Sequence, residues 1–108
     1  MESLLEQCRI LNGMIMDSKE YKNYVYARNT MLSNEELNNA LTEFKNRYAD
    51  VMKYTDGNPY DELLSLYMEN DELIHNSAVN EFLRAESAFS KLIKRVIGEI
   101  SDGFNLDF

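Results

Sequence analysis

Several residue types are scarce in this chain, and each scarcity excludes something. Cys8 is the only cysteine, so the chain can form no internal disulfide and no metal cage from its own thiolates. One proline and four glycines in 108 residues argue against an all-β fold, which needs many turns. The apolar runs are far shorter than the roughly 20 residues that cross a membrane, and the N-terminus lacks the pattern of a signal peptide. We therefore expect a cytoplasmic protein with no membrane insertion.

Positive charge is also scarce. The chain has 11 Lys and Arg against 19 Asp and Glu, a formal net charge of −8, and most of the excess lies in residues 58–108. Nucleic acids and anionic membranes are bound chiefly through Lys and Arg. The composition therefore argues against direct nucleic-acid binding and favours proteins as partners.

Good helix formers and helical spacing of apolar residues fill the rest of the sequence. Together with 44% hydrophobic residues, they predict an all-α fold, an elongated antiparallel bundle in a single domain of residues 1–103, with a short tail at 104–108. Five helices are expected, at residues 2–17, 19–31, 34–55, 59–73 and 77–101.

Local start and stop signals support these boundaries. Ser18 and Asn76 are suited to cap the helices that follow them, and Ser33 with Glu36 forms a capping box. Gly57 and Gly103 can take the left-handed conformation that ends a helix.

The last predicted helix is the most amphipathic segment of the chain. Its apolar residues recur at three- and four-residue steps and form one stripe. Glu86 falls inside that stripe, so we expect a buried polar anchor that is hydrogen-bonded or ion-paired. A contact across an interface and a metal or catalytic role are the alternatives for this carboxylate. The stripe consists of Val79, Phe82, Leu83, Phe89, Leu92, Ile93, Val96, Ile97 and Ile100.

Two of the predicted helices are long for so small a chain. At 1.5 Å per residue they span roughly 33 and 37 Å, whereas a compact monomer of this size has a radius of gyration of about 13 Å. Apolar flanks would then remain for other chains, which predicts a homodimer or a related hetero-oligomer. The best interface candidates are Ile10 and Met14 in the first helix and Phe104 and Phe108 in the tail, although the tail could instead fold against its own helices.

The predicted fourth helix contains only acidic charges, among them Glu69, Asp71 and Glu72. Such a face is usually solvated, but it could also dock a basic partner, because complementary charge speeds encounter and fixes orientation. We expect Cys8 to be a small core residue and His75, the only histidine, to be structural or exposed. No constellation of residues indicates catalysis.

Three ordered segments resemble the YlbF/YmcA family of small helical bacterial regulators. The first is Asp17-Ser18-Lys19-Glu20-Tyr21 followed by Tyr24, the second is Leu37 with Glu43-Phe44-Lys45, and the third is Ala78-Val79-Asn80-Glu81-Phe82-Leu83-Arg84-Ala85-Glu86. Phe82 stands where tyrosine is commoner in the family. The likeness covers nearly the whole chain.

The resemblance implies a non-enzymatic regulatory adaptor that assembles with itself or with sister proteins. It further implies a complex that directs ribonuclease Y in messenger RNA processing, with links to competence, sporulation and biofilm formation. Some members contribute cysteines to a shared iron–sulfur cluster, but this chain has none in its tail, so no cofactor is expected. The alternative is a small helical carrier that holds a lipid or metal between helices, with Glu86 as its polar contact.

Overall fold

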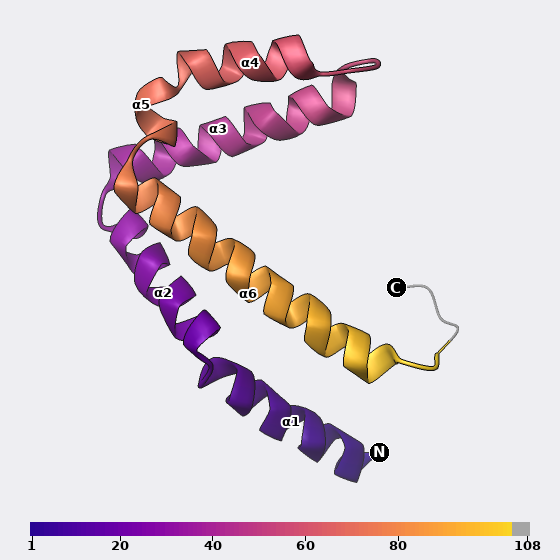
Figure 1. Ribbon diagram of the computed structural model, residues 1–108. Helices are drawn as coiled ribbons and strands as arrows, with labels where there is room; N and C mark the ends of the chain where they lie inside the picture. Colours follow the sequence, from indigo (N-terminus) through magenta and orange to yellow (C-terminus); the bar gives the residue numbers. More distant parts are fainter. Residues whose placement is uncertain (105–108) are drawn as a thin grey trace. The chain divides into compact units, whose positions relative to one another are not determined.

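The computed structural model describes residues 1–104, which are all-helical and contain no strand. The predicted helix class is therefore confirmed, and the boundaries differ from prediction by only one or two residues for most helices (Figure 1). The helices are α1 (Glu2–Met16), α2 (Lys19–Leu32), α3 (Glu35–Tyr54), α4 (Tyr60–Glu69), α5 (Asp71–Ile74) and α6 (Ser77–Ser101).

The described residues form six helices, and the prediction of five is wrong at one point. The segment expected to be one helix over 59–73 breaks at Asn70. Its backbone N–H bonds to the carbonyl of Tyr67 at 3.2 Å, and its side-chain amide donates to the carbonyl of Leu66 at 2.8 Å. These bonds occupy carbonyls that a continuing helix would use, so α4 ends and the one-turn α5 follows.

The helix starts follow the expected signals, with one shift. Ser18 Oγ accepts from the N–H of Tyr21, and Asn76 Oδ1 accepts from the N–H of Val79, both at 3.1 Å. The cap of α3 is Asn34 rather than Ser33: Asn34 Oδ1 accepts from the N–H of Leu37 at 3.1 Å. The Ser33 hydroxyl donates instead to the carbonyl of Thr30 at 2.7 Å, so the expected capping box does not form.

The chain divides into two compact units. Unit 2 is Ala27–Phe82, and unit 1 is Met1–Tyr26 together with the chain from Leu83 onward. The boundaries fall inside α2 and α6, so each of these helices contributes to both units. The predicted single domain, antiparallel arrangement and dimer stay predictions.

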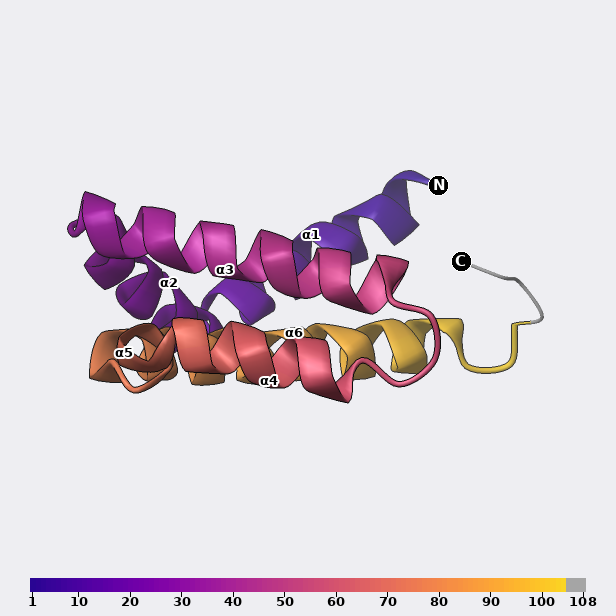
Figure 2. The same ribbon diagram turned by 90° about the horizontal axis from the view of Figure 1, so that it is seen from above.

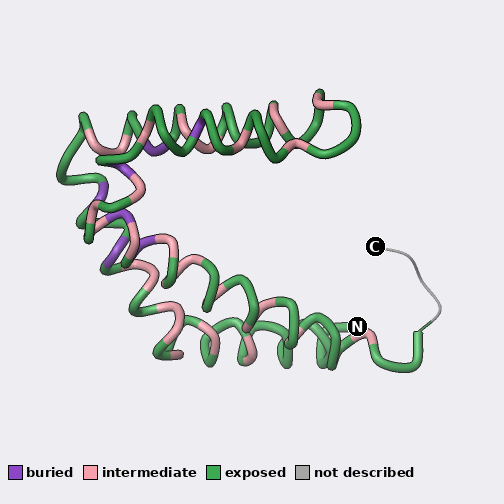
Figure 3. The backbone as a smooth tube through the Cα atoms, turned by 45° about the horizontal axis from the view of Figure 1, so that its top comes forward, coloured by how far each residue is buried: buried purple, intermediate pink, exposed green. Residues whose placement is uncertain are grey.

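Unit 2 contains the core. Within it, α3 and α4 lie side by side, joined by the loop at 55–59, in which Gly57 takes the expected left-handed conformation with a φ of +75° (Figures 1 and 2). The rings of Phe44 and Tyr67 stack across α3 and α4 with centroids 5.8 Å apart. Every buried residue of the described chain belongs to this unit (Figure 3): Ala27, Met31, Leu41, Leu66, Leu73, Val79 and Phe82.

Unit 1 is held together by aromatic contacts and lacks the buried core of unit 2 within residues 1–104. Phe89 of α6 contacts Tyr21 and Tyr24 of α2, with ring centroids 5.3 and 5.4 Å apart. None of its described residues is buried, and α1 lies exposed or half-exposed along its whole length (Figure 3). Cys8 is exposed, so its expected place in a core is wrong: no element within residues 1–104 covers its face of α1.

The structure also corrects the predicted burial of Glu86. It is only partly buried, and the described residues include no buried polar or charged side chain. The reason is that the stripe around it is itself incompletely covered, since only Val79 and Phe82 of its apolar residues are buried. Glu86 does have an interaction partner, and its role as a polar anchor stays a prediction.

Candidate protein-docking groove

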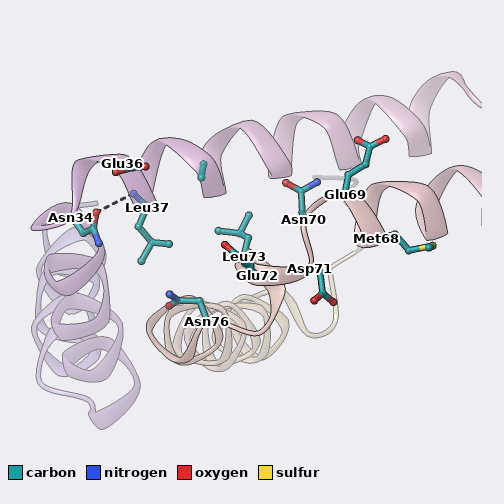
Figure 4. Close-up of a pocket in the computed structure, with 11 residues that line it drawn as sticks. Asn34, Glu36, Leu37, Met68, Glu69, Asn70, Asp71, Glu72, Leu73 and Asn76 are labelled. Carbon is teal, nitrogen blue, oxygen red and sulfur yellow. Dashed lines mark hydrogen bonds between the residues drawn. The ribbon is translucent and has the colours of Figure 1, made fainter.

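A groove of about 600 Å³ lies on unit 2, between the beginning of α3 and the α4–α5 junction (Figure 4). Its position follows from the local sequence, because several helix ends meet there. The caps Asn34 and Asn76 begin α3 and α6, and Asn70 ends α4. The groove is lined by Asn34, Glu36, Leu37, Ala40, Met68, Glu69, Asn70, Asp71, Glu72, Leu73 and Asn76.

The floor of the groove is apolar. Leu73 of α5 is buried and Leu37 of α3 is half-buried, and both side chains point into the space between the two helices (Figure 4). Met68, at the end of α4, is 71% exposed and forms an adaptable side wall. An aliphatic side chain of a partner could therefore lose water here against Leu37 and Leu73 (Figure 4).

The rim of the groove is acidic. Four of the lining residues are carboxylates and none is Lys or Arg: Glu36, Glu69, Asp71 and Glu72. The three residues predicted as an acidic docking face all line the groove, and α3 adds Glu36, which the sequence indicated only as part of a capping box. Glu36 lies more than 30 residues earlier in the chain, so only the packing of α3 against α5 reveals its place in the site.

Two of the four carboxylates already have partners. Arg47 donates to Glu69 at 2.6 Å, and this hydrogen bond raises the pKa of the Arg47 guanidinium above its ordinary value. Asp71 lies 3.3 Å from Nδ1 of His75, which is strongly exposed, as the sequence suggested. Glu36 and Glu72 have neither an ion pair nor a hydrogen bond from their side chains within residues 1–104. Two negative charges at the rim are therefore uncompensated.

The other predicted interface residues lie in unit 1. Ile10 and Met14 are 50% and 65% exposed on α1, and Phe104 is 58% exposed just beyond α6. Phe108 lies outside the described residues. Their function as an interface stays a prediction.

Among residues 1–104, no group of three or more His, Cys, Asp or Glu side chains is placed to hold a metal ion. None of the helices in that range combines the length and apolar character that a membrane span requires.

Residues 1–104 form a small all-helical fold with exposed apolar side chains on unit 1 and an acidic groove on unit 2. The chain belongs to the YlbF/YmcA family: the family model described as "Control of competence regulator ComK, YlbF/YmcA" matches residues 4–105. The resemblance expected from the three sequence segments is confirmed, and the family is one of regulators. No curated protein and no solved structure gave a match.

Proposed function

We propose that the chain is a non-enzymatic regulatory adaptor that acts by assembling with other protein chains. The observation that carries this proposal is the apolar surface of unit 1, which its own described residues leave uncovered. Its exposed large apolar residues are Met1, Leu4, Leu5, Ile10, Met14, Met16, Tyr26, Ile97, Ile100 and Phe104.

Uncovered apolar faces on helices have an energetic consequence. Helices of 15 residues are marginal alone in water, and most are stabilised by packing of an apolar face. Each Å² of apolar surface removed from water contributes roughly 25 cal/mol, so covering α1 and the end of α6 by another chain would stabilise unit 1 substantially. A partner surface is thus the natural complement of unit 1.

Charge makes a second copy or a sister protein a suitable partner. Unit 1 holds eight acidic and seven basic residues, whereas unit 2 holds eleven and four. Two nearly neutral unit 1 surfaces can approach without the repulsion that two copies of unit 2 would meet. We propose a homodimer or a hetero-oligomer with sister family proteins, built on α1 and α6.

The regulated process is proposed from the family. The family description supports a role in controlling the competence regulator ComK. We propose that the assembled adaptor modulates ribonuclease Y-dependent messenger RNA processing in the cytoplasm, and through it competence, sporulation and biofilm formation.

The test combines purified proteins with a surface substitution. Sedimentation velocity of the full chain at micromolar concentration should show a dimer or larger species, and purified ribonuclease Y or a sister protein should co-migrate with it. Ile10→Glu with Met14→Glu should give monomer and abolish co-migration, because charges on an apolar interface are costly to bury.

The matched control is Met52→Glu with Leu64→Glu, which charges two exposed apolar side chains of unit 2. We expect this variant to assemble like the unmodified chain. An unmodified chain that stays monomeric and binds neither sister proteins nor ribonuclease Y would show that the adaptor proposal is wrong.

A further inference from the structure

We propose that the groove on unit 2 binds a short basic segment of a partner protein, which inserts an aliphatic side chain between flanking Lys or Arg residues. The inference rests on the proposed function, because it names the kind of partner that the adaptor takes through unit 2. It is independent of the unit 1 surface, since all the lining residues lie in Ala27–Phe82.

The apolar floor determines the anchor. Leu37 and Leu73 face the space between α3 and α5, and Met68 lies at its edge with most of its side chain in water (Figure 4). Covering these side chains favours a branched aliphatic group, and the flexible thioether of Met68 can adjust to it. The anchor should therefore be Leu or Ile.

The rim determines the charge of the flanking residues. Glu36 lies on one wall and Glu72 on the other, and neither side chain has an ion pair or hydrogen bond in the described chain. No Lys or Arg lines the groove, so nothing in the walls neutralises them. The smaller groove beside it, of about 300 Å³, contains Arg47 and lacks this one-sided charge.

Charge also decides among possible occupants. A nucleic acid would be repelled by the rim carboxylates, and unit 2 of another copy carries the same excess of negative charge. In a segment with Lys or Arg on both sides of its anchor, the apolar anchor complements the floor and the cations complement the rim carboxylates. Such a match supplies both affinity and orientation. This is the partner chemistry that we infer.

The probe is a fluorescein-labelled peptide, KKLLKKLLKK, titrated with the full-length chain by fluorescence anisotropy. We expect saturable binding. The peptide KKSSKKSSKK, with the same charge but no apolar anchor, should bind at least about tenfold more weakly, as should EELLEELLEE, with the anchor but the opposite charge.

Charge reversal at the rim locates the site. Glu36→Lys with Glu72→Lys should weaken binding of KKLLKKLLKK by about tenfold or more. The matched control is Glu35→Lys with Glu81→Lys, which makes the same change in net charge on unit 2 outside the groove and should weaken binding less than about twofold. Glu35 and Glu36 share the first turn of α3, so both variants disturb that helix start alike.

A second pair of variants tests the apolar side wall. Met68→Ser should weaken binding by about threefold or more, whereas Met52→Ser, at an exposed methionine outside the groove, should leave it unchanged.

Several outcomes would overturn the inference. Equal weakening by the two charge-reversal pairs, or equal binding of the leucine and serine peptides, would mean attraction to net charge alone. A change in sedimentation mass caused by Glu36→Lys with Glu72→Lys would mean that another copy of the chain occupies the groove. Failure of the adaptor proposal would appear differently, as an unmodified chain that stays monomeric and binds neither sister proteins nor ribonuclease Y while its binding of KKLLKKLLKK is unchanged.

Discussion

At the residue scale, the start of α3 shows how small a shift separates a capping box from the cap that forms. Both Ser33 and Asn34 can cap a helix, and the sequence places a glutamate three residues after Ser33. In the structure, the Ser33 hydroxyl is bonded to the carbonyl of Thr30 at the end of α2, which leaves Asn34 to accept from Leu37. The turn between α2 and α3 thus uses one side chain for each helix.

This division of roles predicts unequal costs of substitution. Asn34→Ala should lower the free energy of unfolding by about 1 kcal/mol, because an N–H of the first turn loses its acceptor. Ser33→Ala should cost less than about 0.5 kcal/mol, because its hydroxyl caps no N–H of α3 and the exposed carbonyl of Thr30 can bond to water instead. Urea denaturation followed by circular dichroism measures both, and Asn34→Ser, which keeps a capping oxygen, should retain most of the stability. A larger loss of stability for Ser33→Ala than for Asn34→Ala would show that Ser33 caps α3, as the capping box predicted.

At the element scale, the contrast between α1 and α2 matters most. α1 holds apolar residues over much of its surface and none is buried, whereas α2 places Met31 in the core at 1% exposure. Apolar periodicity shows which face of a helix is available for packing, but not whether another element covers it. The misplaced expectations for Cys8 and Glu86 have this common origin.

The contrast is testable with one pair of methionines. Met31→Ala removes a fully packed side chain and should destabilise the protein by about 2–5 kcal/mol. Met14→Ala, at 65% exposure, should change the free energy of unfolding of dilute chain by less than about 0.5 kcal/mol. Chemical denaturation at submicromolar concentration makes the comparison, and equal losses at the two sites would show that α1 is already covered within a single chain.

At the scale of the whole molecule, the sequence predicted the helices far better than their packing. Caps and apolar spacing are local signals, so Ser18, Gly57 and Asn76 placed the boundaries well. The break at Asn70 was missed because Leu66 and Leu73 continue the helical spacing across it. The groove was half predicted: its acidic residues on α4 and α5 are adjacent in the chain, but the contribution of Glu36 depends on tertiary contact.

The distribution of buried residues leads to a prediction for the intact protein. If unit 1 is completed by another chain, folding and assembly are linked, and the melting temperature must rise with protein concentration. For a chain of this size we expect roughly 5 °C for each hundredfold increase. Differential scanning fluorimetry measures how the melting temperature depends on protein concentration. A range of about 1 to 100 µM spans typical dimer affinities.

The variant Ile10→Glu with Met14→Glu should melt at a lower temperature and lose this dependence on concentration, whereas Met52→Glu with Leu64→Glu should keep it. The difference between the two pairs matters because both add two negative charges to exposed apolar positions. A flat melting temperature in the unmodified chain would mean that the aromatic contacts of Phe89 with Tyr21 and Tyr24 suffice to hold unit 1 without a partner. The exposed side of α1 would then remain in contact with solvent in a stable monomer, and the assembly proposal would lose its physical basis.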